Sequence, residues 1–443
     1  MRLEVIEEKI RRRVNAFLSK QGMFHGDISI PETCDVFLSE MDKGLAGKKG
    51  SLAMLPTYIE TERELPRDKA VIVMDAGGTN FRVAAVTFRP NGQAEITDFK
   101  NYPMPGITAE VGKEEFFGTM AGYVRDLADR SGSVGFCFSY PIEMFPSKDG
   151  RALYFSKEIK APKAAGQMIG ENMGQALRIL GISDPKHFVL LNDTVATLLA
   201  GRAEASGRKF DSFIGFILGT GTNTAYVEQN KNIKEAKDLD PNANQIINVE
   251  SGGFAKAPRG TIDTRADRAS VSPGMYPFEK MISGAYIGPL CLVTARAAAQ
   301  KGLFSTAAAE RLAGIPAVVS KDISNFLSCP EEGDNPLSLA LARMPEEDIA
   351  TLYYLTDALV ERAAKLTAIN LSSVSLKSGR GLNPCRPICI VAEGSTFYRL
   401  KSLQQKIEYY LKQYLVDKKH VYYEIVEVEN ATLIGAAIAG LTN

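Results

Sequence analysis

Two small-residue turns in this chain have the composition of a phosphate-binding site. One follows four apolar residues and Asp75 in VIVMDAGGTNFR (71–82), and the other lies in ILGTGTNTAYVE (217–228), so that Gly-Thr-Asn occurs twice. Glycine lets backbone amides approach an anion closely, and threonine and asparagine add side-chain donors. The two turns could therefore hold a polyphosphate, although they could also be hairpins in which glycine serves the turn geometry alone.

The residues around the first turn add a carboxylate and a cation. Asp75 ends an apolar strand directly before the turn, where a carboxylate can hold Mg²⁺, either directly or through water. Arg82, two residues beyond Asn80, could point at the same anion. The chain contains no GxxxxGK[ST] sequence, which argues against the P-loop class of nucleotide-binding proteins.

A candidate general base stands in LLNDTVATLLAG (190–201), where a strand runs into a helical pattern. Asp193 could take the proton of a phosphoryl-acceptor hydroxyl, held in place by Asn192 and nearby backbone donors. The same Asn-Asp-Thr sequence is also typical of a helix N-cap, because all three residue types cap well. Both interpretations stay open from the residues alone.

Other loops carry polar residues that could contact a sugar or a phosphate. Ser139 in SYPIE, with Ser156 and Lys157 in FSK, could offer two hydroxyls and a cation, or could belong to an ordinary surface turn. Glu250 in NVESGGF and Glu279 in PFEK could accept hydrogen bonds from sugar hydroxyls. Glu279 at a helix N-terminus is also favoured by the helix dipole alone.

The elements that must position these residues alternate between strand and helix, which is typical of an α/β fold. Strands are predicted at 70–75, 82–88, 133–140, 187–193, 388–395 and 421–428, and as a pair joined by the second turn at 212–228. Helices are predicted at 4–20, 113–130, 164–181, 194–205, 276–300 and 432–442, and 302–350 as helical with loops. Residues 21–69 are predicted to be a connection punctuated by glycine and proline. The repeated turn suggests an internal duplication.

Length and composition predict a globular protein of two or three domains, because 443 residues exceed one compact core. A formal net charge of +0 gives no electrostatic footprint for nucleic acid or an anionic membrane. The start of the chain has no signal-peptide core, and the apolar run 433–441 is too short to span a bilayer. Six scattered cysteines and three histidines do not form a zinc motif, and predict reduced thiols in a cytoplasmic protein.

Together these stretches resemble the hexokinase family, whose members have the actin-like ATPase (ribonuclease H-like) fold. The matching stretches, in the family's order, are VMDAGGTNFRVAAV, VGFCFSYP, LLNDTVATLLAG, GFILGTGTNTAYVE, NVESGGF, FEKMISGAYIG and VAEGST. GAAIAG near the end is similar to the family's last helix. The resemblance implies an α/β protein of two domains with an interdomain cleft. The large domain would comprise residues 1–61 and 191–428, and the small domain residues 62–190 and 429–443.

The resemblance also implies a role for each matching position. Asp193 falls on the catalytic base, and Lys157 would steady the charge of the transferring phosphoryl group. The positions that match sugar-binding residues are Ser139, Ser156, Lys157, Asn192, Asp193, Asn223, Glu250 and Glu279. The positions that match nucleotide-binding residues are Asp75, Gly77, Gly78, Thr79, Asn80, Arg82, Gly219, Thr220, Gly221, Gly284 and Ser395. Asp75 would also hold Mg²⁺, and Ser320 and Ser324 match adenosine contacts loosely.

The activity that the resemblance implies is transfer of the ATP γ-phosphoryl group to the 6-hydroxyl of glucose or a related hexose, the first step of glycolysis. Mg²⁺ would bridge the β- and γ-oxygens. We expect a cytoplasmic monomer or homodimer that binds hexose and nucleotide but neither nucleic acid nor membranes. A non-catalytic sugar sensor and an actin-like filament or chaperone ATPase are the alternatives on the same fold. The sensor would lose the base or a phosphate turn, and the ATPases do not require the sugar-side residues.

The chain departs from the family pattern at five positions. Ala76 stands where leucine is usual, Tyr140 where phenylalanine is usual, and both Phe155 and Ser251 where tryptophan is common. Glu393 stands where aspartate is usual, and the chain contains no tryptophan. None of these changes removes a group that does chemistry, whereas the lost aromatic bulk alters the cleft walls and hence the expected sugar preference. The chain also lacks the cysteine-rich zinc motif of the other bacterial sugar-kinase family.

Overall fold

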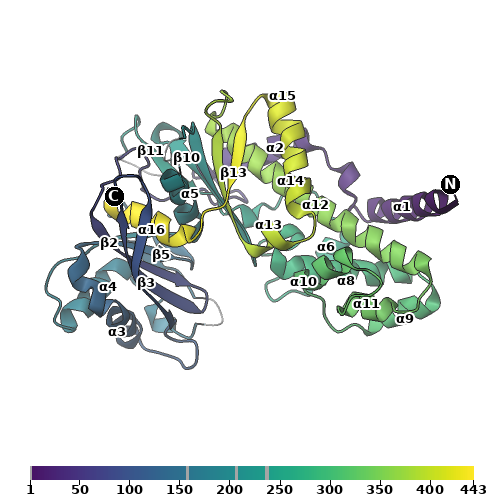
Figure 1. Cartoon of the computed structure of the whole chain (residues 1–443), viewed down its shortest axis with the longest axis horizontal. Helices are drawn as coiled ribbons and strands as arrows, with labels where there is room; N and C mark the ends of the chain where they lie inside the picture. Colours follow the sequence, from purple (N-terminus) through teal and green to yellow (C-terminus); the bar gives the residue numbers. More distant parts are fainter. Residues whose placement is uncertain (1, 156–158, 205–207, 235–238) are drawn as a thin grey trace.

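The computed structural model describes residues 2–155, 159–204, 208–234 and 239–443. Figure 1 shows one β-sheet with helices α3 and α4 at the lower left, a second sheet above it, and a group of helices on the right. Helices α5 (Asp193–Glu204) and α16 (Ala431–Thr442) lie between the two sheets. We call the body around the first sheet the small lobe and the body around the second sheet the large lobe.

The small lobe is built on a five-stranded sheet in the order β4-β3-β2-β5-β8. Its strands are β2 (Ala70–Gly77), β3 (Asn80–Phe88), β4 (Ala94–Pro103), β5 (Ser133–Phe138) and β8 (His187–Leu191). Neighbouring residues of β2 alternate between its two faces. Ile72 and Met74 pack with α3 (Lys113–Val124) and α4 (Ile169–Ile179), whereas Val71 and Val73 pack with α5 and α16. Both faces of the sheet are therefore covered by helices.

The large lobe repeats this strand order with one strand added. Its sheet runs β1-β11-β10-β9-β12-β13, formed by β1 (Leu55–Pro56), β9 (Ser212–Leu218), β10 (Thr222–Gln229), β11 (Asn244–Asn248), β12 (Ile388–Glu393) and β13 (Tyr423–Val426). Both sheets contain three successive antiparallel strands, β4-β3-β2 or β11-β10-β9, followed by two strands parallel to the last of them. The added strand β1 pairs antiparallel with β11. The repeated topology bears out the internal duplication that the repeated turn predicts.

Helices α5 and α16 approach each other and the sheets so closely that side chains are excluded at the contacts. A Cβ atom added to Gly435 of α16 would overlap the carbonyl oxygen of Ala196 in α5. A Cβ atom on Gly135 of β5 would likewise overlap the carbonyl oxygen of Ala436. Glycine at these two positions brings the first turns of both helices to the ends of the sheet strands, where Asp193 begins α5.

Most remaining helices form the large lobe around one continuous apolar core. They are α1 (Arg2–Lys20), α2 (Ile30–Leu45), α6 (Thr261–Arg268), α7 (Glu279–Ile282), α8 (Gly284–Gln300), α9 (Thr306–Gly314), α10 (Ser320–Ser328), α11 (Pro336–Leu341), α12 (Glu346–Ser378), α13 (Ser395–Arg399), α14 (Leu403–Leu411) and α15 (Asp417–Lys419). In the described part of the chain, none of these helices is both long and apolar enough to cross a membrane. Among the residues that the structure describes, Cys34, Cys137 and Cys291 are buried free thiols, and Cys329 and Cys385 are exposed free thiols.

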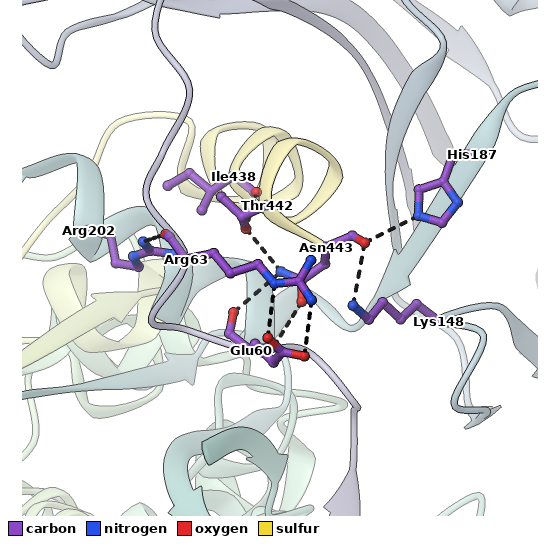
Figure 2. A network of polar contacts seen from close by, with 8 residues as sticks. All are labelled: Glu60, Arg63, Lys148, His187, Arg202, Ile438, Thr442 and Asn443. Atoms are coloured by element: carbon purple, nitrogen blue, oxygen red, sulfur yellow. Dashed lines mark hydrogen bonds and ion pairs between the residues drawn. The ribbon is translucent and has the colours of Figure 1, made fainter. Parts of the chain in front are cut away.

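The segment that crosses from β1 to β2 is tied to the end of α16 (Figure 2). The backbone N–H of Glu60 donates to the side-chain oxygen of Asn443 over 2.9 Å, and the side-chain N–H₂ of Asn443 donates to the Glu60 carbonyl over 3.3 Å. Arg202 of α5 donates to the carbonyl of Arg63 in the same segment over 2.6 Å. The small-lobe residue Lys148 donates to the carbonyl of Asn443 over 3.4 Å. One crossing point between the lobes is thus held by both central helices.

The structure corrects two predictions of local structure and adds two elements that were not predicted. Residues 21–69 are not only a connection, because α2 begins there with Ser29 as its N-cap and Pro31 in its first turn. The predicted helix 276–300 is broken at Ser283 into α7 and α8. The 33-residue helix α12 was not predicted, since burial on several sides leaves it without a clear apolar stripe. Strand β4 was missed because its residues are mostly polar and exposed.

We expect that Gly435→Ala destabilises the chain by about 1–3 kcal/mol, because the new methyl group must push α16 away from α5. The matched control is Gly118→Ala in α3, where no atom lies within 4 Å of the added methyl group and where alanine should stabilise the helix by about 0.5–1 kcal/mol. Thermal unfolding followed by circular dichroism compares the two variants. Equal Tm values for both variants would contradict the close helix contact.

Candidate active site

A cavity of ≈ 520 Å³ lies where the two lobes meet. The sequence-predicted residues that line it are Ser139, Asn192, Asp193, Gly221, Asn223, Glu250 and Glu279. These residues come from the ends of β5, β8, β9 and β11 and from the starts of α5, β10 and α7, which lie far apart in the sequence. The structure therefore brings together every described residue that matches a sugar-binding position. Ser156 and Lys157 lie outside the described residues.

Asp193 is the first residue of α5 and also lines the cavity. Asn192 acts as the N-cap of α5, since its side-chain oxygen accepts the backbone N–H of Thr194 over 2.9 Å. The Asp193 carboxylate accepts the same N–H over 2.7 Å through Oδ1. The contacts of Asp193 with the N–H and the hydroxyl of Thr194 both use Oδ1, and among the described residues none donates to the second carboxylate oxygen, Oδ2. Capping and chemistry are therefore compatible at this strand-to-helix junction.

The surroundings of Asp193 make it a weaker acid than an ordinary aspartate. Its pKa is raised to about 6, mainly by burial and also by the negative charges of Asp75 and Glu250, whereas the hydrogen bond from Thr194 opposes the shift. A carboxylate with a pKa close to neutral is suited to accept a proton near physiological pH.

The large-lobe wall of the cavity is a hydrogen-bonded group around Glu250. Asn248 donates to Glu250 Oε1 over 2.8 Å, and Asn223 donates to the same oxygen over 3.3 Å. Burial raises the pKa of Glu250, and the two amide donors oppose the shift. Glu250 also has a left-handed backbone (φ 56°), which is uncommon outside glycine and is often found at functional sites. The two asparagines orient one carboxylate toward the cavity.

Glu279 links the sugar-side wall to the second small-residue turn. Its carboxylate accepts the backbone N–H of Thr222 over 3.0 Å, directly after the turn formed by residues 219–221. Burial raises the pKa of Glu279. Gly221 has no room for a side chain, because a Cβ atom there would lie 2.6 Å from Glu279 Oε2. The second turn and the predicted sugar-binding carboxylate therefore form one packed unit.

The second turn is also fixed from its other side. Gly284, at the start of α8, donates its N–H to the carbonyl of Gly219 over 2.8 Å, and Thr396 donates its hydroxyl to the same carbonyl over 2.8 Å. Ala285 donates its N–H to the carbonyl of Thr220 over 3.1 Å. The break between α7 and α8 at Ser283 allows this contact. Gly219 is buried, whereas Thr220 is exposed.

The first turn is the exposed tip of the β2–β3 hairpin. Gly77 pairs with Asn80, and the loop residues are Gly78, in a left-handed conformation (φ 51°), and Thr79. Tyr140 donates its hydroxyl to the carbonyl of Gly78. Gly78, Thr79 and Asn80 are exposed, so their donors can reach a ligand. These turn residues do not line the cavity that contains Asp193.

Asp75 lies just below the first turn and is buried. It accepts hydrogen bonds from Arg82 Nη1 over 3.5 Å and from the hydroxyl of Thr432, in the first turn of α16, over 3.2 Å. Burial raises the pKa of Asp75, and the Arg82 charge opposes the shift. Asp75 therefore connects the first turn to the helix that packs against α5.

A second cavity, of ≈ 420 Å³, collects the remaining predicted nucleotide-side residues. Its lining residues are Ser320, Lys321, Ser324, Asn325, Ser395, Thr396, Arg399 and Leu400. Ser395 begins α13, while Ser320 and Ser324 belong to α10. Thr396 also contacts the second turn through Gly219. The second cavity thus adjoins the turn that leads to the cavity containing Asp193.

Glu393 was named in the sequence only as a departure from the family pattern, and the structure places it among the site carboxylates. Its pKa is raised to about 7, mainly by burial and also by the charges of Asp193 and Asp75, while Arg82 opposes the shift. Glu393 ends β12 directly before Gly394, and Asp75 likewise lies near the end of a strand, β2, two residues before Gly77. This repeated pattern of strand, carboxylate and glycine was a signal that could have identified Glu393 from the sequence.

The residues around Asp75 suit a hydrated magnesium ion. Among the residues that the structure describes, no three histidine, cysteine, aspartate or glutamate side chains are grouped to hold a metal. Mg²⁺ bound to a nucleotide needs only one or two carboxylates, because phosphates and waters supply the other ligands. The mutual repulsion of Asp75, Asp193 and Glu393 would be relieved by a cation. The donor set therefore fits the ion.

Two sheets of one topology, a cavity between the lobes and two small-residue turns define a protein of the actin-like ATPase fold. Sequence profiles described as Hexokinase match residues 24–203 and 213–442. The chain belongs to the hexokinase family and is an enzyme that phosphorylates hexoses with ATP.

Individual relatives agree with this assignment. The chain is 26% identical to Hexokinase-7 of Oryza sativa subsp. japonica over 425 residues, which is 90% of each chain. It is 30% identical to Hexokinase-1 of Schizosaccharomyces pombe over 269 residues, a match that spans 58% of this chain and 54% of that relative. The structure of the Schistosoma mansoni hexokinase complexed with glucose matches with a TM-score of 0.77, covers 99% of this chain and 100% of its own, and is 22% identical. At that identity the structural match supports the fold.

We expect that Glu393→Gln raises Tm at pH 8 by on the order of 2 °C. The pKa of Glu393 is raised from 4.5 to about 7, so ionising this side chain destabilises the fold. That cost is absent below pH 4.5, grows between pH 4.5 and 7, and is complete above pH 7. The gain should therefore vanish at pH 4.5. Thermal unfolding at both pH values checks this, with the exposed Glu429→Gln as a control that changes neither Tm. A pH-independent gain would contradict it.

Proposed function

We propose that the chain transfers the γ-phosphoryl group of ATP to the 6-hydroxyl of glucose or a related hexose, with Asp193 as the general base. The observation that carries the proposal is the position of Asp193. It lies in the cavity between the lobes, its pKa is raised to about 6, and it is surrounded by hydrogen-bonding side chains suited to a sugar. The glucose bound to the Schistosoma mansoni relative supports glucose as the first acceptor to test.

In the proposed reaction the 6-oxygen of the hexose attacks the γ-phosphorus. The bond from the γ-phosphorus to the β–γ bridging oxygen breaks, and that oxygen leaves with the electron pair as part of ADP. The proton of the attacking hydroxyl moves to the Asp193 carboxylate. At pH 7 most Asp193 side chains are ionised and can accept it, because the pKa lies about one unit lower.

The sugar-side residues orient the acceptor. Glu250 and Glu279 would accept hydrogen bonds from sugar hydroxyls, while Asn192, Asn223 and Ser139 would add neutral donors and acceptors. Several fixed hydrogen bonds of this kind would hold the hydroxyl at the reacting distance. Such positioning lowers the activation barrier of the transfer. Ser156 and Lys157 are proposed to contribute from the same side on the strength of the family match alone.

The nucleotide would lie along the two turns, with its base and ribose near Ser395 and its phosphates toward Asp75. Backbone amides of the turns and Arg82 would contact phosphate oxygens. We propose Asp75 as the carboxylate that holds Mg²⁺, which when bound supplies charge neutralisation for the phosphate oxygens. Gly284 would keep the second turn in position.

The proposed domain boundaries place residues 1–61 and 191–428 in the large domain, and residues 62–190 and 429–443 in the small domain. Sugar binding would close the cleft between them and exclude water as a competing acceptor.

We further propose a cytoplasmic enzyme that acts as a monomer or homodimer. A non-catalytic sugar sensor would be expected to lose the base or a phosphate turn, and this chain retains Asp193 and both turns.

Replacing the base tests the proposal. We expect that Asp193→Asn lowers kcat by at least about 100-fold, because the amide cannot accept the proton. Its oxygen can still accept the Thr194 N–H, so α5 should keep its first turn. A coupled assay for hexose 6-phosphate measures kcat, and calorimetry should show hexose affinity within about tenfold of the unsubstituted enzyme.

The control for that experiment is Asp184→Asn, the same chemical change at an exposed loop position of the small lobe. We expect it to leave kcat unchanged. An Asp193→Asn enzyme with near-normal kcat would refute the base. An unsubstituted enzyme that binds hexose but forms no phosphate ester would instead favour the sensor.

The pH dependence of kcat is a second test. Protonation removes the base, so kcat at saturating substrates should be near its plateau above pH 7. Below about pH 6 it should fall tenfold per pH unit. Direct measurement of ADP avoids pH effects on coupling enzymes. A kcat that stays constant from pH 7 to pH 5 would show that Asp193 does not take the proton in the rate-limiting step.

A further inference from the structure

Two tyrosines from opposite lobes meet at the wall of the cavity that contains Asp193. The hydroxyl groups of Tyr154 and Tyr276 lie 2.9 Å apart and form a hydrogen bond. Tyr154 follows β7 (Gly150–Ala152) in the small lobe, whereas Tyr276 precedes α7 in the large lobe. Both residues line the same cavity as Asp193 and Glu250. The bond therefore joins the two walls of the sugar cleft directly.

The small-lobe tyrosine is held by its neighbours. The backbone N–H of Leu153 donates to the carbonyl of Pro141 over 2.9 Å, which fixes the chain just before Tyr154. The ring of Phe155, just after it, packs at 5.1 Å from the ring of Phe116 and 5.3 Å from the ring of Tyr140, measured between centroids. The Tyr154 side chain itself is about half exposed. Its backbone is therefore fixed while its ring lies at the opening of the cavity.

The large-lobe tyrosine is held by a buried ion pair. Lys280 Nζ lies 2.5 Å from Asp267 Oδ1 and donates to the carbonyl of Ser272 over 2.6 Å. Asp267 also accepts the backbone N–H of Gly274 over 3.2 Å. The loop from Ser272 to Tyr276 is thus fastened at two points. The ion pair that fastens it includes Lys280, the neighbour of Glu279.

Tyr276 adopts a backbone conformation that needs such support. Its φ of 50° is in the left-handed region, which costs energy for a bulky residue and persists only where the surroundings impose it. Burial raises the pKa of Tyr276, followed by its bond to Tyr154 and by the charges of Glu250 and Glu279. The hydroxyl group is therefore neutral and close to the sugar-side carboxylates. A strained residue aimed at a site is a recognised indication of function.

We propose that the hydrogen bond between Tyr154 and Tyr276 is a closing contact of the sugar cleft, which positions the two walls for hexose binding and for the exclusion of water. This inference rests on the proposed function of the cavity. Neither residue would touch the transferring phosphoryl group, so both are positioning residues. Because the bond joins two lobes, it can form only when the walls are close together. Its free energy then contributes to the affinity for the acceptor that lies between them.

The expected size of the effect follows from one neutral hydrogen bond. Such a bond contributes a modest net free energy, which corresponds to a roughly two- to tenfold change in an equilibrium constant. Tyr154→Phe and Tyr276→Phe each remove one hydroxyl group and keep the ring. We expect each variant to raise KM for glucose by this factor, with kcat changed less than twofold. The double variant should equal either single variant, because one lost partner already breaks the bond.

A second measurement reports how readily water enters the cleft and competes with the sugar as phosphoryl acceptor. Hydrolysis of ATP in the presence of saturating glucose, measured as phosphate released per hexose 6-phosphate formed, should rise by a similar factor in all three variants. A role confined to folding would instead lower Tm and the fraction of active enzyme, without changing this ratio or separating KM from kcat. Thermal unfolding of each variant is measured alongside.

The matched control is Tyr123→Phe. Tyr123 lies on the small lobe and donates its hydroxyl to the carbonyl of Pro103 over 3.3 Å, outside the residues that line the cavity. The same loss of one hydroxyl group there should change neither KM nor the hydrolysis ratio. The closing contact would be overturned if KM stayed unchanged in the single variants. It would also be overturned if the effects of Tyr154→Phe and Tyr276→Phe added in the double variant. An unsubstituted enzyme inactive on every hexose would overturn the proposed function instead.

Discussion

Repulsion among buried and half-buried carboxylates is the constraint on which this structure depends. Asp75, Asp193 and Glu393 come from β2, α5 and β12, and the charges of the first two raise the pKa of the third. Placing like charges together away from water costs free energy that no local interaction of the strands recovers. Arg82 is the cation that the described chain offers nearby. This cost is consistent with our proposal that a cation bound with the nucleotide completes the site.

Close helix packing is what forces those carboxylates together. Gly435 of α16 and Gly135 of β5 leave no space for side chains, so the two central helices begin at the edge where both sheets end. The first turn of α16 contacts Asp75 through Thr432, and Asp193 begins α5. The duplicated topology therefore has a chemical consequence. The first half supplies Asp75 and Asp193, the second half supplies Glu393, and each half supplies one small-residue turn.

The lobes are connected on two sides of this centre. On one side Asn443 and Arg202 hold the crossing segment near Glu60 through hydrogen bonds to its backbone. On the cavity side Tyr154 and Tyr276 meet through their hydroxyl groups. The first connection is made by the central helices and can serve as a pivot, whereas the second lies at the cleft wall. A motion that opens the cleft would keep the first set of contacts and break the second.

The sequence by itself determined the strand-to-turn motifs, the helix start at Asn192-Asp193-Thr194, the family and the polar sugar-side residues of the cavity, because these depend on local geometry and on residue types at short spacing. Only the tertiary structure decided that Glu393 joins Asp75 and Asp193, and that the pKa of Asp193 rises to about 6. It also revealed the pairing of Tyr154 with Tyr276 and the helix α12 inside the large-lobe core. The physical reason is that burial, charge repulsion and contacts between lobes arise among residues more than a hundred positions apart, for which a single sequence carries no local signal.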